Sequence, residues 1–186
     1  MMRLFVAVNL SPAAREAIQS ALDDFPFKNY PWRWVGPDNW HLTLKFLGET
    51  SAAQVESLNA ALHDVARRHR AFDMTLGKFG GFPNLRNPRV LFYNIEQGAV
   101  ELGGLANDVD AAVEKAIGLE RDRRRFQAHV TVARVKDALS PDIVERFPRV
   151  PALTQAVTRV DKFELMESRL ARTGATYSVV KEFALS

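Results

Sequence analysis

The sequence predicts an α+β protein built from two similar halves, and three observations lead to this class. Strand-like and helix-like segments are mixed along the chain without the strict alternation of a parallel, doubly wound fold. The order strand, long helix, strand occurs twice. A His-x-Thr tripeptide stands in the same place in both repeats. We therefore expect a duplicated fold with two antiparallel sheets and with helices on the outside.

The chain opens with a strand followed by a helix. Residues 3–9 are apolar enough for a buried strand. Ser11 is a good N-cap with Pro12 at the first helical position, which predicts a helix to about Asp24. The apolar stretch at the start is too short for the core of a signal peptide. No window approaches the roughly 20 apolar residues of a membrane span, so we expect a cytoplasmic protein without a membrane partner.

Two strands, a second helix and a third strand complete the first half. The segments "WRWV" and "WHLTLKFL" predict the first two strands. The helix begins with the capping-box pair Ser51 and Gln54, and its apolar residues recur at helical spacing. A further strand is predicted over 72–79. The turn-rich segment "GGFPNLRNPR" at 80–89 is our candidate for the joint between the halves.

The second half repeats this order. A strand over 90–95 is followed by a helix whose apolar stripe stops at Gly118. The segment "FQAHVTVARV" predicts another strand, and Ser140–Pro141 starts a short helix. We expect a final strand pair over 157–166 and 175–185.

Composition limits the kinds of site that the chain can hold. There is no cysteine among the 186 residues, which excludes a disulfide scaffold, a cysteine–zinc site and a thiol nucleophile. The net charge is only +3, but a basic cluster, "RDRRR", stands at 121–125. Arginine suits bidentate recognition of phosphate, so this cluster is either an ordinary solvated surface or a contact for a polyanion.

The two His-x-Thr tripeptides are the strongest chemical signal in the sequence. Thr43 follows His41 by two residues and Thr131 follows His129 in the same way, with aliphatic residues on both sides of each threonine. Residues two apart in a strand point to the same face, so each pair presents an imidazole beside a hydroxyl. Two amphipathic strands with polar outer faces are the alternative, which accounts for one such motif better than for a matched pair.

A pair of imidazoles suits displacement at phosphorus. One neutral histidine can accept a proton from water while a charged one donates a proton to the leaving oxygen. Threonine hydroxyls can bind the non-bridging oxygens as charge develops. Strict alternation puts Lys45 on the histidine face, whereas Arg134 reaches that face only if a bulge or the strand's end redirects it. The spacing matches no metal-binding motif, so we expect no metal.

Beyond these motifs, the sequence resembles the 2H phosphoesterases, and within them the RNA 2',3'-cyclic phosphodiesterases, formerly called 2'-5' RNA ligases. Two departures from the family pattern are Asn9, where aspartate is frequent, and Ala128, where proline is common. The resemblance covers nearly the whole chain in five ordered blocks: "RLFVAVNL", "RWVGPDNWHLTLKFLGE", "FGGFPNLRNPRVLF", "FQAHVTVARVK" and "FELMESRLARTGATYSVVKEFAL".

The resemblance implies one two-lobed, pseudo-symmetric domain over 1–186 with a cleft flanked by the motif strands. We place the lobes near 1–80 and 88–186 and leave open an exchange of terminal strands between them. The family implies hydrolysis of RNA 2',3'-cyclic phosphate termini to 2'-phosphates, without metal, ATP or any other cofactor. It carries over four catalytic residues: His41 as proton donor, His129 as proton acceptor, Thr43 and Thr131.

The remaining expectations concern the substrate and the competing functions. We expect Arg134, Lys45 and Phe82 to bind the substrate, Phe82 by stacking on the terminal base. We also expect a monomer, and reversible 2'-5' RNA ligation as a side activity. The reverse assignment of the two histidines stays open. Other substrates of 2H phosphodiesterases, ADP-ribose cyclic phosphate or 2'-5' oligonucleotides, are one alternative function, and a non-catalytic RNA-binding module is another.

Overall fold

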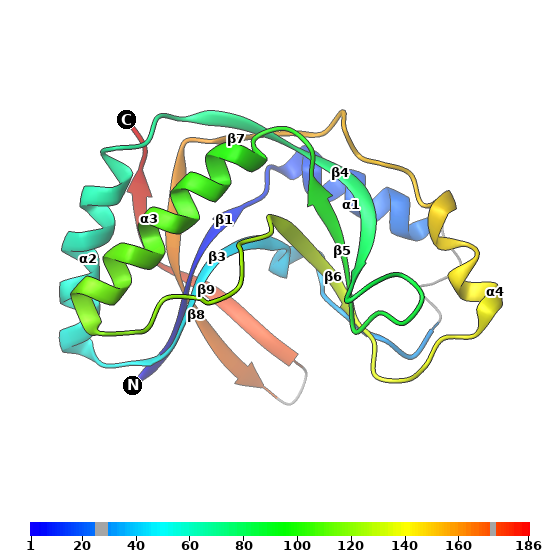
Figure 1. Ribbon diagram of the computed structural model, residues 1–186, viewed down its shortest axis with the longest axis horizontal. Coiled ribbons are helices and arrows are strands. Elements are labelled where there is room, and N and C mark those ends of the chain that lie inside the picture. Colours follow the sequence, from blue (N-terminus) through cyan, green and yellow to red (C-terminus); the bar gives the residue numbers. More distant parts are fainter. Residues whose placement is uncertain (25–29, 172–173) are drawn as a thin grey trace.

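The chain folds as one curled antiparallel sheet with helices packed on it (Figure 1). The computed structural model describes residues 1–24, 30–171 and 174–186. Its strands are β1 (Met2–Asn9), β2 (Arg33–Trp34), β3 (His41–Thr50), β4 (Phe72–Phe82), β5 (Val90–Ile95), β6 (His129–Arg134), β7 (Val157–Val160), β8 (Lys162–Ala171) and β9 (Gly174–Ala184). Its helices are α1 (Pro12–Asp23), α2 (Ala52–Ala66), α3 (Ala99–Ile117) and the short α4 (Pro141–Val144), with 3-10 turns η2 (Pro37–Asn39) and η3 (Phe147–Arg149).

The strand order is β7-β4-β5-β6-β3-β1-β8-β9, and β2 pairs with β6. Every strand pair among the described residues is antiparallel. The α+β class, the antiparallel strands and the outer helices are therefore confirmed. The two expected sheets are joined edge to edge between β3 and β6, where the register contains the single pair Leu42 and Val130.

The helix ends follow the local chemistry that the sequence contains. The Ser11 hydroxyl accepts a hydrogen bond from the Ala14 N–H at the start of α1. Ser51 and Gln54 form the expected reciprocal capping box at the start of α2. Gly118 ends α3 at a positive φ of 73°, a conformation that glycine adopts without steric cost.

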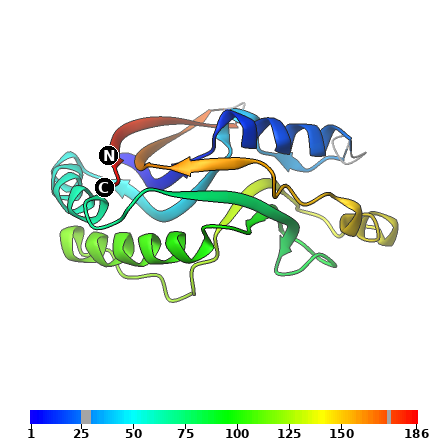
Figure 2. The same ribbon diagram turned by 90° about the horizontal axis from the view of Figure 1, so that it is seen from above.

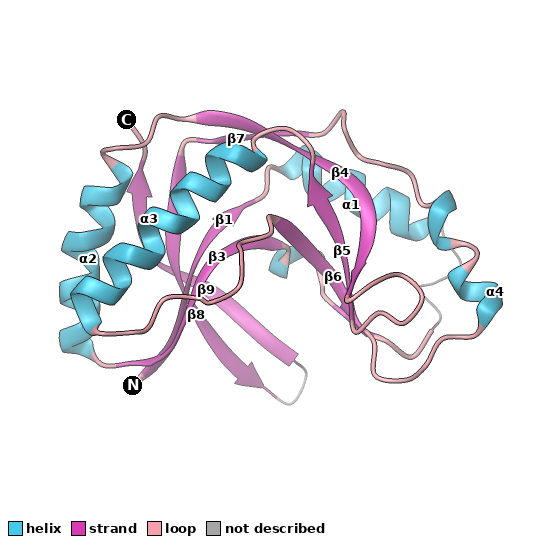
Figure 3. Cartoon of the chain, viewed as in Figure 1, coloured by secondary structure: helices cyan, strands magenta, loops and turns pink. Residues whose placement is uncertain are grey.

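Each half of the sheet contains strands from the other half of the chain. β4 follows α2, yet it pairs with β5 and β7. β8 follows the second motif strand, yet it pairs with β1. Figure 3 shows β8 and β9 extending from this part of the sheet as a long hairpin. The two motif strands lie at the middle of the sheet as a result.

Two predicted strand boundaries are wrong. The segment 157–166 is not one strand, because it breaks at Asp161 into β7 and β8, which belong to distant parts of the sheet. β7 buries alternate residues, Thr158 and Val160, whereas β8 buries four consecutive residues, 163–166. β4 also continues beyond residue 79 to Phe82, which pairs with Val90, so the joint between the halves is shorter than predicted.

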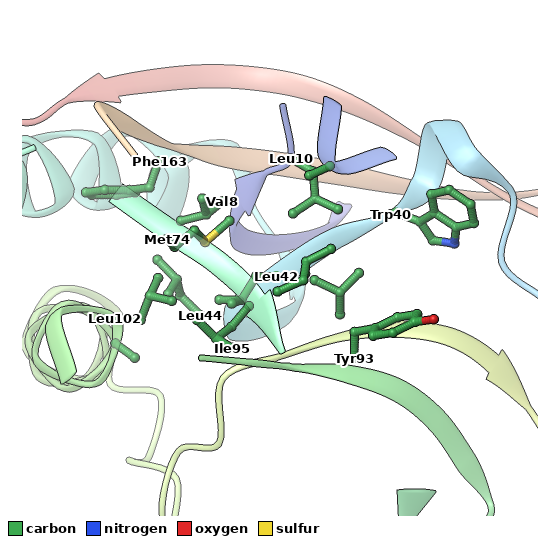
Figure 4. Packing of buried hydrophobic residues seen from close by; sticks show 14 of the residues in the cluster. Val8, Leu10, Trp40, Leu42, Leu44, Met74, Tyr93, Ile95, Leu102 and Phe163 are labelled. Carbon is green, nitrogen blue, oxygen red and sulfur yellow. The ribbon is translucent and has the colours of Figure 1, made fainter. Parts of the chain in front are cut away.

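The main core lies between one face of the sheet and the helices. Val8, Leu42 and Leu44 pack there beside Met74 and Leu102 (Figure 4). α2 and α3 pack against each other, α3 contacts β3, and α1 lies apart from them against β7 (Figure 2). No helix in the described part of the chain is long and apolar enough to cross a membrane.

Candidate active site

The two motif strands lie side by side, which brings both His-x-Thr pairs together. Leu42 and Val130 face each other across β3 and β6 and are fully buried. Residues one position away in each strand point to the opposite face. His41, Thr43, His129 and Thr131 therefore share the face turned away from the main core, which we call the site face. In an antiparallel register each histidine lies across from the other strand's threonine.

A backbone carbonyl fixes the orientation of the His41 ring. Nδ1 of His41 lies 2.7 Å from the carbonyl oxygen of Asn39, which can only accept a hydrogen bond, so Nδ1 carries a proton. Nε2, the atom left to gain or lose a proton, lies 3.1 Å from the hydroxyl oxygen of Thr43. The Asn39 side chain in turn donates to the carbonyl of Ala175, at 2.9 Å, which connects this turn to β9.

His129 is held in the same way. Its Nδ1 lies 2.7 Å from the carbonyl oxygen of Gln127, again two residues earlier in the chain. Nε2 of His129 is therefore also the nitrogen available for proton transfer. The cross-strand neighbours match too, because Asn9 on β1 is opposite His41 and Asn94 on β5 is opposite His129. Two equivalent half-sites result.

Aromatic rings surround both histidines. The ring of His41 lies 4.9 Å from that of Phe5 and 5.1 Å from that of Tyr177, between ring centroids. On the other side, Phe82 and Phe92 lie 5.1 and 5.4 Å from the ring of His129. Phe82 is thus on the site face, as the sequence suggested, although it sits on a strand. Its stacking on a base stays a prediction, because Phe82 already stacks on Phe92 at 4.2 Å.

A glycine makes room for this aromatic pair. Gly80 on β4 is opposite Phe92 on β5. A Cβ atom on Gly80 would lie 2.8 Å from the ring of Phe92, so the ring would have to move. The absence of a side chain on Gly80 therefore lets the ring of Phe92 cover the strand next to His129.

Burial lowers the pKa of both histidines. Burial, helped by the charges of Arg15 and His129, lowers the pKa of His41 to about 4, although the hydrogen bond to Asn39 acts in the opposite direction. Burial lowers the pKa of His129 as well, helped by the charge of Arg134. Both imidazoles are consequently neutral near pH 7 in the free protein.

One extra residue in each motif strand changes which side chains reach the site face. In β6 the register skips Val132, since Leu91 is opposite Ala133 while Phe92 is opposite Thr131. In β3 it skips Leu44 in the same way. These bulges turn the following residues over. Arg134 is opposite Val90, the partner of Phe82, so the bulge brings Arg134 to the site face.

The prediction that Lys45 shares the histidine face is wrong, and the bulge at Leu44 is the reason. Lys45 is buried, with its ammonium 2.6 Å from a carboxylate oxygen of Asp110 and 3.0 Å from one of Asp122. Although burial raises it, the hydrogen bond and charge of Lys45 bring the pKa of Asp110 below its usual value. Lys45 thus holds α3 and the segment after it, rather than a ligand on the site face.

The sequence reasoning missed several residues of the site face. Phe46, which follows the first bulge, is 66% exposed and is opposite Phe5. Arg15 on α1 donates a hydrogen bond to the carbonyl of Pro37 and so supports the turn before His41. Tyr177 arrives from β9, more than a hundred residues away in the chain. None of these features left a clear local signal, because Leu42, Leu44 and Phe46 keep the alternation of an unbroken strand.

Comparison with known proteins gives consistent matches over the whole chain. A family model described as LigT-like phosphoesterase matches residues 8–92 and 95–177. A protein of Thermus thermophilus named RNA 2',3'-cyclic phosphodiesterase is 35% identical, over 99% of this chain and 90% of its own length. A protein of the same name from Archaeoglobus fulgidus is 31% identical, over 98% and 99%.

Solved structures show the same likeness. The crystal structure of E. coli LigT complexed with 3'-AMP superposes with a TM-score of 0.80 at 30% identity, covering 100% of this chain and 98% of that one. A crystal structure of a Thermus thermophilus protein gives 0.79 at 32% identity, covering 99% and 98%. These likenesses extend over the strands that carry both His-x-Thr pairs.

Proposed function

This chain belongs to the LigT-like phosphoesterase family, and on that premise we propose that it hydrolyses RNA 2',3'-cyclic phosphate termini to 2'-phosphates. The observation that supports this most is the pairing of two equivalent His–Thr half-sites on adjacent strands, His41 with Thr43 and His129 with Thr131. Relatives at 31% and 35% identity carry the name of this activity. Binding alone would need no matched pair of proton-transfer groups.

In the proposed reaction, water attacks phosphorus while the bond from phosphorus to O3' breaks. His129 accepts the proton of the attacking water through Nε2, and its lowered pKa keeps it neutral at pH 7, as a base must be. His41 donates a proton from Nε2 to O3', which leaves a 3'-hydroxyl and a 2'-phosphate. Thr43 and Thr131 bind the non-bridging oxygens, where negative charge increases in the transition state.

The proton donor must be charged, and the substrate supplies the reason. In the free protein the pKa of His41 is about 4, so its imidazole is neutral at pH 7. A cyclic phosphate bound between the half-sites puts a negative charge beside Nε2, which favours the imidazolium form. Arg134, on the site face through the bulge in β6, provides a second counter-charge for the same phosphate.

Incubation with a nucleoside 2',3'-cyclic phosphate in the presence of a chelator tests the proposal. We expect a nucleoside 2'-phosphate as the product, identified by phosphorus NMR. Release of the 3'-phosphate would contradict the proposed bond cleavage. A requirement for added metal would contradict the paired-histidine mechanism. With a 5'-hydroxyl in place of water, the same displacement of O3' would give the 2'-5' ligation that we propose as a side activity, and its reverse would re-form the cyclic phosphate.

We further propose that the chain acts as a monomer and as one 2H phosphoesterase domain over residues 1–186, with pseudo-repeat lobes near 1–80 and 88–186. The matched pairs of Asn9 with His41 and Asn94 with His129 support the duplication. One chain supplies both half-sites, which supports a monomer, and light scattering measures the mass directly. The lack of cysteine fits the reducing cytoplasm.

A further inference from the structure

A pocket of about 1120 Å³ lies beside His129, between α3 and the segment 119–128 that leads into β6. Figure 1 shows this segment running from the end of α3 to the start of β6. Phe82 and Phe92, whose rings contact His129, form part of its wall. Gln127, whose carbonyl orients the histidine, forms another part. The pocket and the proposed catalytic base therefore share a wall.

Asp110 and Asp122, two anions in the wall of this pocket, are matched by two cations, Arg121 in the same wall and the buried Lys45 behind it. The ammonium of Lys45 contacts Asp110 and Asp122 and donates to the carbonyl of Glu120 at 3.1 Å. Arg121 lies 3.4 Å from Asp110 and donates to the side chain of Asn107 at 2.6 Å. Residues 120–122 are thereby fixed to α3 and β3.

The arginines beyond these ion pairs leave the rim positively charged. Arg124 and Arg125 line the pocket and are exposed, and neither makes an ion pair with any residue that the structure describes. Arg123 makes only a 3.8 Å contact with Glu120, in which both side chains are exposed. Guanidinium groups with no protein partner, held on a fixed segment, suit the bidentate binding of phosphate.

We propose that this pocket binds the RNA chain on the 5' side of the reacting nucleotide, with Arg124 and Arg125 contacting its phosphodiesters. This inference rests on the proposed function. A 2',3'-cyclic phosphate forms the 3' end of its RNA. The rest of the RNA therefore extends from the 5' side of the reacting ribose and must pass out of the site. The pocket reaches Phe82, Phe92 and Ala128 next to His129. Its volume exceeds the usual 300–1,000 Å³ or so of a small-ligand site, which leaves room for a further nucleotide. Its Phe82 and Phe92 wall can stack on a base.

Comparing two substrates that share the reacting group tests the pocket. One is adenosine 2',3'-cyclic phosphate, and the other is a tetranucleotide that ends in the same group. We expect the tetranucleotide to have the higher kcat/KM, mainly through a lower KM. In the double variant Arg124→Ala/Arg125→Ala, kcat/KM for the tetranucleotide should fall about tenfold or more, as expected when contacts to charged groups are lost, and for the mononucleotide by less than about twofold.

The matched control is Arg67→Ala/Arg68→Ala, which removes the same charge from the exposed end of α2. We expect this control to change neither substrate's kcat/KM by more than about twofold, since surface charges away from the ligand have small effects. An equal loss in the control, or an equal loss for both substrates, would overturn the proposal and make the rim an ordinary solvated surface.

Salt dependence gives a second readout that does not require turnover. The binding of a fluorescent tetranucleotide ending in a 2'-phosphate can be followed by anisotropy. Two lost phosphate contacts should reduce the salt slope by about 1.4, so that a fourfold rise in salt weakens the wild type roughly sevenfold more than the variant. Equal salt slopes for the wild type and the double variant would refute the proposed binding of RNA in this pocket. If the salt slopes differ as expected but the wild type hydrolyses neither substrate, the pocket would stand and the proposed function would be refuted.

Discussion

Phe46 and Arg134 occupy equivalent places in the two halves of the sheet. Each follows its motif histidine by five residues, and each is turned to the site face by a single extra residue in its strand, Leu44 or Val132. The backbone arrangement is thus repeated, but the side chain at the equivalent position differs. It is an exposed aromatic ring in one half-site and a cation in the other. This difference gives a nearly symmetric site a direction.

Replacing each histidine by alanine separates the two proton transfers. General acid–base groups contribute roughly 10²- to 10⁴-fold, so both variants should lose that much kcat on the normal substrate. A cyclic phosphate with sulfur in place of O3' has a leaving group that needs no protonation. That substrate should restore His41→Ala toward wild-type turnover and leave His129→Ala inactive. Rescue of His129→Ala alone would reverse the assignment.

Arg134→Ala should lower kcat/KM for the cyclic phosphate roughly 10- to 100-fold, the effect of losing a hydrogen bond between charged groups. The matched control is Arg149→Ala, which removes an exposed arginine from η3, away from the motif strands. Steady-state kinetics on both variants decide the matter. If the two variants behave alike, the bulge in β6 has no role in substrate binding.

The lowered pKa of His41 predicts a pH-dependent stability. The unfolded chain takes up this proton near pH 6.5, whereas the folded protein does so only near pH 4. The unfolded state therefore binds more protons between these values, so the free energy of unfolding falls as the pH falls through this window, by at most about 3 kcal/mol. His129, with its lowered pKa, acts in the same direction.

Urea unfolding of the wild type and of His41→Asn at pH 7.5 and pH 5 measures this effect. Asparagine can still donate to the carbonyl of Asn39 but does not titrate. The wild type should lose more stability than the variant between the two pH values. An identical loss in both proteins would mean that His41 titrates normally in the folded state.

Lys45→Met should destabilise the protein by roughly 3 kcal/mol, because Asp110 would keep a partly buried charge without its main partner. For a chain of this length that corresponds to a melting temperature lower by about 6–12 °C. The control Arg159→Met breaks an ion pair with Asp73 in which both side chains are largely exposed, and it should cost under about 1 kcal/mol. Equal shifts in differential scanning calorimetry would contradict the structural role of Lys45.

The sequence was sufficient for whatever depends on local chemistry and strict alternation. The capping box at Ser51, the helix end at Gly118 and the shared face of each histidine with its threonine all follow from such signals. Lys45 and Arg134 exchanged their expected faces because a bulge is set by the register of the neighbouring strand, which periodicity alone does not contain. The break at Asp161 was missed because it depends on strand pairing: β7 pairs with β4 and β8 pairs with β1, in distant parts of the sheet. Tyr177 and Arg15 join the site only through tertiary packing.

The exchange of β4 and β8 has a consequence for how the molecule can be divided. A chain cut within residues 83–89 would yield two pieces that each hold one motif histidine. Each piece would also hold at least one strand whose partners are all on the other piece, such as β4 in the first and β7 in the second. Neither fragment could complete its own sheet, and each would present an open edge that only the other fragment matches. The two pieces are therefore complements rather than domains, and activity should return only when they are mixed. The two halves repeat each other in their order of elements, but neither can form its sheet without the other.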